Sequence, residues 1–510
     1  MNFGSPCLLL FVLLAVAVQP TASFDLSSIA DLWSNLKTKI DDYIRGDGTI
    51  TEEEAELLEK LNQTTSNLDD FHKRLEEMRK KIKSEIKIHP VNKTAIDALL
   101  KKISKKVHDH IRKGGDNIEE VNEKLNVTGD FYQGDMILTK EQIDELYPKE
   151  GAVQKRQAFG SGYGGRTWST FYYSFQAGLP THAITVSRIA IRYWQANTCV
   201  NFVESSTALP RVNFFQGQGC YSYVGNIGTR AQELSLGQNC DQVGVAAHEI
   251  GHALGFFHEQ SRHDRDTAIT VVPANIVASF VDQFNKESTR TNNNYGLPYD
   301  YGSIMQYAGQ SVSRNGMPTM VAKVPQYQDT MGSQIISFRD ISAMNSLYNC
   351  KARCPAATSA KCQNGGFPHP RNCGTCLCPS GYGGTLCNQR PAGCGAALTA
   401  TATAQTLTAS VGDGVYSVKD EFTFCNWMIT APAGMRIQAT ITRYNQNACT
   451  SGCAYGGVEM KWRPDKTLTG SRYCCPSDVN ESVTTTTNIM PIIAFNRYGR
   501  ETFSISYRAV

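Results

Sequence analysis

The chain has 510 residues, of which 50 are basic and 47 acidic, and it contains 17 cysteines. At about 150 residues per domain, this length excludes a single hydrophobic core and predicts several domains. The two signs of charge nearly cancel, so the net charge of +3 gives no indication of a nucleic-acid partner.

Composition divides the chain near residue 156. Residues 24–156 carry 23 Lys and Arg against 27 Asp and Glu, which is a net charge of −4, and they contain no cysteine. Residues 157–510 carry 27 basic and 20 acidic residues, which is a net charge of +7, together with sixteen cysteines. These two parts are therefore expected to be separate regions.

Residues 1–23 have the pattern of a secretory signal. An apolar run from Leu8 to Val18 precedes Gln19, Pro20 and the small residues 21–23. The run is too short to span a bilayer, and a buried apolar helix is the alternative. The even number of remaining cysteines then predicts eight disulfides in an oxidising compartment, and hence a secreted, extracellular protein with no membrane span.

Residues 24–156 are predicted to be helical and exposed in the secretory pathway. Apolar residues recur at spacings of three and four between charged ones, at Leu68, Phe71, Leu75, Met78 and Ile82. Three Asn-X-Thr sequons predict glycosylation at Asn62, Asn92 and Asn126.

The first region ends at the dibasic pair Lys155-Arg156, which a Gly-rich stretch at 160–165 follows. A dibasic pair at a composition break indicates a processing site, so we expect an activating protease to cut after Arg156.

Beyond this site the pattern becomes that of a mixed α/β unit. Residues 170–175 alternate as a strand does, residues 186–194 have apolar residues at helical spacing, and another extended stretch begins at Cys199. Strand, helix and strand in succession favour an α/β or α+β domain, which we place at residues 157–350.

Two smaller modules follow. Residues 351–389 hold six cysteines, and because so short a segment cannot bury a sizeable core, disulfides must stabilise it. Residues 394–510 are rich in Thr, Val and Ile, with alternating runs at 436–441 and 502–507 that predict an all-β sandwich. A further sequon predicts glycosylation at Asn480. The chain is thus predicted to be multidomain.

Residues 248–258 carry the pattern that indicates chemistry, H-E-x-x-H-x-x-G-x-x-H. His248 and His252 are about 40° apart around a helix, so both imidazoles can bind one metal ion. Gly255 can adopt a positive φ and end the helix, which brings His258 to the same ion. Three imidazoles favour zinc over calcium or magnesium, and three protein ligands leave one position open for water.

An open zinc position predicts hydrolysis. Zinc lowers the pKa of bound water to about 7, and Glu249 can take its proton as the water attacks an amide carbonyl. Isolated histidines are more often core or surface residues, but three in this register with Glu249 and Gly255 favour the metal site.

The segment resembles the metzincins, and within them the astacin family of zinc endopeptidases. Phe256, Glu259 and the continuation at 262–266 (R-H-D-R-D) carry the resemblance, as does S-x-M-x-Y at 303–307. The resemblance implies that Met305 forms the hydrophobic floor of a Met-turn. It also implies that Tyr307 is an additional zinc ligand that swings away to stabilise the tetrahedral intermediate.

The resemblance extends to the modules and their cysteines. The six-cysteine unit resembles an EGF-like module and residues 394–510 a divergent CUB domain, an order typical of nematode astacins. The disulfides that this resemblance implies are Cys199–Cys350, Cys220–Cys240, Cys354–Cys373, Cys362–Cys376, Cys378–Cys387 and Cys394–Cys425. The pairing of Cys449, Cys453, Cys474 and Cys475 stays open.

For residues 24–156 the resemblance implies the role of an inhibitory pro-segment. Astacin pro-segments contain F-x-G-D, and residues 132–135 match it with Tyr132 in place of Phe. Asp135 would then occupy the water site of the zinc and keep the zymogen silent. After cleavage, the new amino terminus would insert toward Glu259, although the alternative for Gly134-Asp135 is an ordinary turn.

Calcium is not predicted in either module. The CUB calcium pattern Y-D-x-V-E is replaced by Tyr455-Gly456-Gly457-Val458-Glu459, and the EGF-like unit lacks the acidic residue before its first cysteine.

The sequence therefore predicts a secreted zinc metalloendopeptidase that acts on extracellular proteins, such as those of a matrix or cuticle. Two alternatives stay open: a catalytically silent adhesion or scaffold protein that uses its EGF-like and CUB modules, and a metallohydrolase acting on a non-peptide amide.

Overall fold

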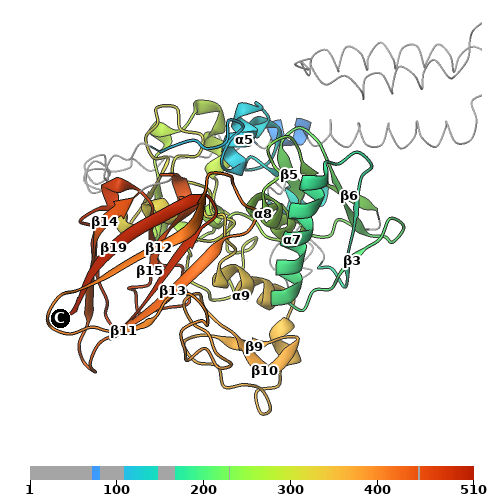
Figure 1. Cartoon of the computed structure of the whole chain (residues 1–510). Helices are drawn as coiled ribbons and strands as arrows, with labels where there is room; N and C mark the ends of the chain where they lie inside the picture. The colour runs from blue at the N-terminus through green and yellow to red at the C-terminus, as the bar shows by residue number, and fades with distance from the viewer. Residues whose placement is uncertain (1–71, 78, 81–107, 147–166, 229, 446–447) are drawn as a thin grey trace, which may run out of the picture. The chain divides into compact units, whose positions relative to one another are not determined.

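The structure is a computed structural model that describes residues 72–77, 79–80, 108–146, 167–228, 230–445 and 448–510 (Figure 1). All of these residues belong to one compact unit, residues 71–510. The predicted signal, the sequons at Asn62 and Asn92, and the predicted cleavage site at Arg156 lie outside the described residues. Among the described helices, none combines the length and hydrophobicity that a bilayer span requires.

Residues 24–156, predicted above to be a pro-segment and called so here, form a series of short elements in their described part. Residues 72–77 and 79–80 are helical. Asn117 begins the next helix by accepting a hydrogen bond from the Glu120 amide, a favourable N-cap. That helix buries Ile118 and Val121 in the core of the following domain. The elements are α5 (Ile118–Lys124), η1 (Thr128–Asp130), β1 (Met136–Ile137) and α6 (Lys140–Leu146).

The central part of the chain, residues 167–350 and here called the central domain, contributes five strands to a six-stranded sheet, and β1 is the sixth. The order is β1-β5-β6-β4-β2-β3, and β1 pairs in parallel with β5 at one edge. The alternating run at 170–175 forms β2, which buries Phe171 and Tyr173. The other strands are β2 (Phe171–Phe175), β3 (Phe202–Glu204), β4 (Arg211–Phe215), β5 (Cys220–Tyr223) and β6 (Ala231–Leu236).

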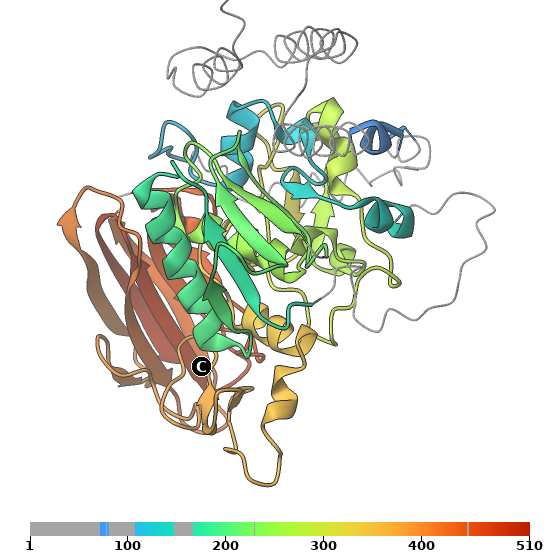
Figure 2. The ribbon, with the colours of Figure 1, turned by 90° about the vertical axis from the view of Figure 1, so that its right-hand side faces the viewer.

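Two helices pack together on this sheet. They are α7 (Thr181–Asn197) and α8 (Val243–Leu254), and Figure 2 shows α7 beside the strands. Trp194 of α7 is fully buried and donates its indole N–H to the Ala247 carbonyl of α8, at 3.1 Å. Because α8 is buried along nearly its whole length, the sheet and α7 hold it rigidly in place.

The second half of the central domain is built from short elements and ends in helix α9 (Phe338–Leu347). This half has a small hydrophobic core of its own, in which the rings of Tyr301 and Tyr327 stack with their centres 4.8 Å apart. The elements are η2 (Glu259–Ser261), η3 (Arg265–Thr267), β7 (Ile269–Val271), η4 (Pro273–Asn275), η5 (Ala278–Phe284), β8 (Met320–Ala322) and η6 (Pro325–Thr330).

The six-cysteine module consists of η7 (Cys350–Arg353) and a hairpin of β9 (Phe367–His369) and β10 (Asn372–Leu377). Arg371 fastens it to the end of α7, because its guanidinium donates to the carbonyls of Gln195 and Thr198, each at 2.8 Å.

Residues 394–510 form two packed sheets, here called the C-terminal sandwich. The run predicted at 436–441 lies in β14, where Ile437, Ala439 and Ile441 are buried on one face. One sheet contains β11 (Ala397–Thr399), β13 (Thr423–Thr430), β18 (Ile489–Asn496), β15 (Gly456–Met460) and β16 (Ser471–Tyr473). The other contains β12 (Gln405–Val415), β19 (Gly499–Ala509), β14 (Ile437–Asn445) and β17 (Ser482–Thr484). Two 3-10 turns are η8 (Ser451–Cys453) and η9 (Pro476–Asp478).

Polar contacts join the C-terminal sandwich to the central domain. Arg472 pairs with Glu459 in the sandwich, at 3.2 Å, and also donates to the Ser333 hydroxyl, at 2.8 Å. The amide of Thr469 donates to the Asp300 carboxylate.

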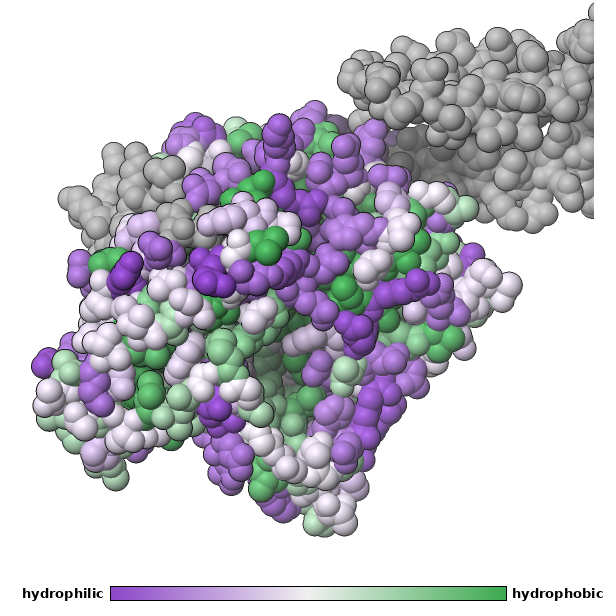
Figure 3. All heavy atoms as spheres, viewed as in Figure 1, coloured by the Kyte–Doolittle hydropathy of each residue, from purple (hydrophilic) through white to green (hydrophobic). Residues whose placement is uncertain are grey.

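On the face shown in Figure 3, hydrophilic residues gather around α5, whereas the sandwich is paler.

Eight disulfides use all sixteen cysteines that follow residue 23, as the even count predicts. The pairs that the sequence left open are Cys449–Cys475 and Cys453–Cys474. The other pairs are Cys199–Cys350, Cys220–Cys240, Cys354–Cys373, Cys362–Cys376, Cys378–Cys387 and Cys394–Cys425.

A buried acid in the C-terminal sandwich predicts a pH-dependent stability. Glu501 of β19 is 2% exposed and accepts a hydrogen bond from the Tyr444 hydroxyl. Burial raises the pKa of Glu501 from 4.5 to about 8, so the folded chain keeps a proton that the unfolded chain releases. This group therefore stabilises the fold most below pH 4.5, and its contribution is lost as the pH rises to about 8.

We expect the Glu501→Gln variant, which cannot ionise, to lose less stability than the wild type between pH 5 and pH 9. Scanning calorimetry is expected to show a difference of about 5 °C or more in the pH-induced fall of Tm. Glu481→Gln, at a partly exposed site of the same sandwich, is the control. Parallel pH dependence of Tm in wild type and Glu501→Gln would contradict the prediction.

Candidate metal centre

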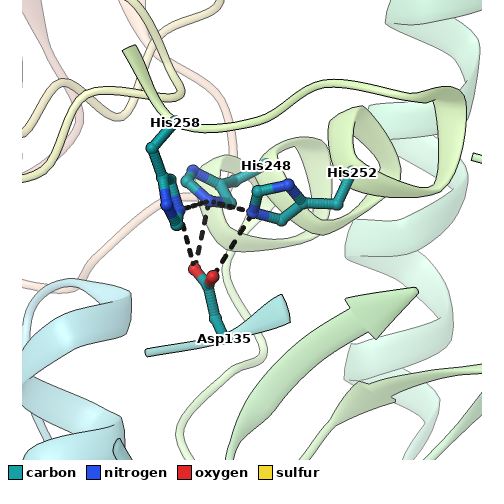
Figure 4. Close-up of side chains that lie close together, drawn as sticks. All are labelled: Asp135, His248, His252 and His258. Atoms are coloured by element: carbon teal, nitrogen blue, oxygen red, sulfur yellow. Dashed lines mark hydrogen bonds and ion pairs between the residues drawn. The ribbon is translucent and has the colours of Figure 1, made fainter. Parts of the chain in front are cut away.

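Helix α8 and the turn after it bring three histidines together (Figure 4). His248 and His252 lie one turn apart on α8, with their Nε2 atoms 2.9 Å apart. Gly255 ends the helix with a φ of 115°, a left-handed conformation that favours glycine. The chain then reverses, so that His258 Nε2 lies 3.3 Å from His248 Nε2.

The outer nitrogen of each ring has its own hydrogen-bond partner. His248 Nδ1 donates to the carbonyl of Ile304 and His252 Nδ1 to that of Phe256, both at 2.7 Å. Because a carbonyl can only accept, these rings carry their proton on Nδ1 and direct the Nε2 lone pair inward. Burial lowers the pKa of His258 to about 4, so this ring is neutral at pH 7.

Inward lone pairs at these distances repel one another unless a cation lies between them. Each of the three rings is at most 3% exposed, so bulk water cannot relieve that repulsion. Neutral imidazoles that converge on one point are the donor set of a zinc site. The residues therefore fit a zinc ion, with His248, His252 and His258 as the candidate ligands.

The pro-segment places a carboxylate at the same point. Asp135 Oδ2 lies 3.2 Å from the Nε2 atoms of both His248 and His258, and Oδ1 lies 3.4 Å from His252 Nε2. Asp135 is fully buried, and its candidate ligand atom lies within 4.8 Å of those of the three histidines. The Tyr307 hydroxyl donates to Asp135 Oδ2 at 2.6 Å, so this tyrosine also reaches the centre.

Glu249 is the acid next to the centre. It follows His248 on α8 and is fully buried, and neither of its carboxylate oxygens has a hydrogen-bond partner among the described residues. Burial, and then the charge of Asp135, raises the pKa of Glu249 well above its ordinary value. A buried carboxyl with free oxygens is suited to accept and donate protons.

The loop at 303–307 packs against the helix that carries His248 and His252. Besides the carbonyl of Ile304, it supplies Met305, which is 2% exposed and packs against Gly251 of α8. A side chain at Gly251 would come within 2.9 Å of the Met305 sulfur, so the glycine permits this close approach. Asp340 of α9 holds the loop by accepting from the Ser303 hydroxyl and the Ile304 amide, at 2.6 and 2.9 Å.

Sequence reasoning did not single out Asn122, which attaches the pro-segment beside Asp135. Its side-chain N–H groups donate to the carbonyls of Gly134 and Cys220, and its oxygen accepts from the Cys220 amide at 2.8 Å. Asn122 thus hydrogen-bonds the backbone of β5 beside the residues that pair with β1. A lone Asn within a short helix carries no sequence signal of this role, because its contacts with Cys220 join residues 98 positions apart.

Two further contacts on either side of Asp135 were also not predicted. Gln133 Oε1 accepts from His258 Nδ1 at 3.1 Å, which gives the third histidine its outer partner. The hydroxyl of Tyr132 donates to the buried Glu287 at 2.8 Å. The Phe of the family pattern has no hydroxyl, so the Tyr in its place was the available signal for the second contact.

Glu259 lies beside a cavity of about 70 Å³ on the other side of the Met-turn loop. Its carboxylate accepts from Arg262 at 3.0 Å and from the Asp300 amide at 2.8 Å. Burial, opposed by the charge of Arg262, raises the pKa of Glu259 to about 7. The cavity is lined by polar and apolar residues that include Glu259, Arg262, Asp300, Met305 and Arg339.

The other predicted site residues lie apart from the centre or brace it. Asn126 and Asn480 are exposed at turns with φ of 58° and 79°. The disulfide Cys220–Cys240 joins the strand β5 to the start of α8, and Cys199–Cys350 joins the ends of α7 and α9. Tyr455 and Glu459, which match the CUB calcium pattern, hydrogen-bond to Asp116 and pair with Arg472 respectively.

Comparison with known proteins gives relatives along most of the chain. The model of the peptidase family Astacin matches residues 162–349. Zinc metalloproteinase nas-31 of Caenorhabditis elegans is 48% identical over 419 residues, which are 80% of this chain and 68% of that relative. Zinc metalloproteinase nas-32 of the same organism is 38% identical over 431 residues, 81% of this chain and 65% of that relative. The chain thus spans about two thirds of the length of these two relatives.

Among solved structures, high choriolytic enzyme 1, a hatching enzyme zinc-protease from the medaka fish Oryzias latipes, matches 38% of this chain and 98% of its own. It is 30% identical, with a TM-score of 0.34. On the strength of the family match and the nas-31 identity over more than two thirds of that relative, the chain belongs to the astacin family of zinc metalloendopeptidases.

Proposed function

We propose that this chain is secreted as an inactive precursor that hydrolyses peptide bonds of extracellular proteins once its pro-segment is cut off near Arg156. One observation carries the proposal. Three inward imidazole lone pairs and the free oxygens of Glu249 are assembled in one buried site, and a pro-segment carboxylate fills the point where they meet. Such an assembly has the parts of a hydrolytic zinc site and of its inhibitor.

His248, His252 and His258 would hold the zinc ion. When bound, zinc supplies a Lewis acid that polarises the scissile carbonyl and lowers the pKa of a water molecule. Glu249 would accept the proton of the attacking water and pass it to the leaving amine. Its free oxygens and its burial support this role, because a carboxyl held out of bulk water keeps the proton until the amine takes it.

Tyr307 would stabilise the oxyanion of the tetrahedral intermediate. Its hydroxyl now donates to Asp135 Oδ2 at 2.6 Å, and the hydroxyl oxygen lies 2.9 Å from the Gln133 carbonyl oxygen. A donor aimed at a carboxylate oxygen in the inhibited state is suited to an oxyanion that replaces it.

The pro-segment would inhibit by filling both the metal position and the substrate edge. Asp135 would occupy the zinc ligand position that is otherwise open to water. In addition, β1 pairs with β5, the edge strand at which an extended substrate would bind. Gly134 fits this role, because its φ of 96° disfavours a larger residue, and a Cβ there would lie only 3.3 Å from the Tyr307 hydroxyl.

After cleavage, the new amino terminus would enter the cavity beside Glu259. The carboxylate there now has Arg262 as its charged partner, and both residues line the cavity. A positively charged amine could then share Glu259 with Arg262 and tie the mature terminus to the turn that carries His258.

Secretion is supported by the cysteines and the surface. Eight disulfides require an oxidising compartment, and the sequons at Asn126 and Asn480 are exposed for glycosylation. The EGF-like module and the C-terminal sandwich would select or dock protein substrates.

The main test is Glu249→Gln in protein processed near Arg156. We expect zinc-dependent cleavage of casein in the wild type and a fall of about 10²–10⁴-fold in kcat in the variant, because the proton acceptor is lost. Metal analysis is expected to show the same zinc content in both, since Glu249 is not a ligand. Glu204→Gln, on the exposed strand β3, is the control. Inert processed wild type would support the scaffold alternative, and loss of zinc from Glu249→Gln would refute the assigned role.

Tyr307→Phe tests stabilisation of the oxyanion. Removing one such donor is expected to lower kcat by about 10²-fold with zinc content unchanged and a smaller effect on KM. Tyr193→Phe, at a position of α7 that is 40% exposed, should behave as the wild type. A rise in KM with an unchanged kcat would assign Tyr307 to substrate binding instead.

Asp135→Ala tests the inhibitory carboxylate. In the unprocessed chain it is expected to raise the background rate of casein cleavage by about tenfold or more, because the carboxylate that fills the metal position and its charge-assisted hydrogen bond from Tyr307 are lost. Asp144→Ala, at a more exposed acid of α6, provides the comparison. A background rate equal to that of the wild type would exclude the aspartate switch.

A further inference from the structure

Residues 109–116 of the pro-segment contact the C-terminal sandwich, and in sequence they precede Asp135, which lies at the metal centre. The amide of Asp109 donates to the Cys449 carbonyl at 2.6 Å, and the Cys449 amide donates to Asp109 Oδ2 at 2.9 Å. This reciprocal pair aligns the two backbones. Ile111 packs against Ala448, Ala454 and Tyr455, which form a small apolar surface next to the Cys449–Cys475 disulfide.

Asp116 forms the second part of this contact. It is 3% exposed and closes the loop at 111–116 by accepting from the amides of Ile111 and Arg112, at 3.0 and 2.8 Å. The hydroxyl of Tyr455 in the sandwich donates to the same carboxylate. Tyr455 therefore contacts the same carboxylate that closes the loop.

A buried cation lies beneath Tyr455. The Arg497 guanidinium is 4.9 Å from the ring of Tyr455 and donates to the Ala454 carbonyl and to Gln242 of the central domain. Among the described residues, Arg497 has no ion-pair partner within 4 Å, and both Arg112 and Asp116 of the facing segment act on it electrostatically. The cation thus packs beneath the ring whose hydroxyl contacts Asp116.

We propose that the C-terminal sandwich is a second binding surface for the pro-segment, so that cleavage near Arg156 does not by itself release the inhibitor. The surface consists of Ala448, Cys449, Ala454 and Tyr455, with Arg497 beneath it, and its occupant is the segment 108–116. This inference deepens the proposed function, because it rests on the proposed cleavage.

The order of the contacts along the chain carries the proposal. The segment 108–116 and Asp135 both precede the predicted cut, so cutting leaves both contacts in place. Two linked contacts hold a ligand far longer than either contact alone, because each keeps the other at high local concentration. Release of the cut pro-segment therefore requires the sandwich contact to open as well as the contact at the metal centre.

The test measures release rather than activity. The full chain carries Glu249→Gln to prevent self-cleavage and a site for an exogenous protease inserted within residues 147–166. After the cut, the mature part is immobilised through its carboxyl end, and the loss of the pro-segment is followed by surface plasmon resonance. We expect slow release from this parent and about tenfold faster release with Tyr455→Phe, because a hydrogen bond to a carboxylate is lost.

Three further variants make the result specific. Asp109→Ala changes the pro-segment alone and is also expected to speed release severalfold, so the test stands even if Tyr455→Phe fails to fold. Tyr416→Phe, 70% exposed on the same sandwich, and Lys113→Ala, exposed on the same loop, should match the parent. Release within twofold of the parent in both Tyr455→Phe and Asp109→Ala would overturn the proposal, as would immediate release from the parent. Because the readout needs no catalysis, an inactive enzyme would leave this result interpretable.

Discussion

Everything at the centre of this protein depends on three nitrogen lone pairs that meet in a buried space. Hydrogen bonds from Nδ1 orient the rings of His248 and His252, so their Nε2 atoms can only face each other and His258. Such an arrangement is unfavourable without a cation and strongly favourable with one. The rest of the central domain serves this constraint: the sheet and α7 hold α8, Gly255 reverses the chain, and Asp340 holds the loop that carries Ile304.

The same constraint accounts for the form of the pro-segment. A zinc site that would bind a carbonyl oxygen and water would also attract a carboxylate, and Asp135 supplies one from a strand that extends the sheet at β5. A carboxylate in so small a space must be placed accurately. Asn122 provides this accuracy by joining Gly134 to the backbone of Cys220.

The C-terminal sandwich adds a further level of control in the proposed scheme. It is joined to the central domain through Arg472 and Ser333, and to the pro-segment through Tyr455 and Asp116. In this scheme the sandwich would bind the inhibitory pro-segment before activation and would dock protein substrates after activation.

The sequence by itself determined the features whose residues are close together in the chain. The register of the three histidines, the helix-ending Gly255 and the alternating strands of the sandwich depend on periodicity, which local sequence expresses. Only the tertiary structure decided which distant groups meet: Asn122 with Cys220, Tyr132 with Glu287, Tyr455 with Asp116, and the pairing of the last four cysteines. These contacts join residues 21 to 339 positions apart, and no local pattern encodes them, because their energy comes from burial and hydrogen bonding that exist only once the chain has folded.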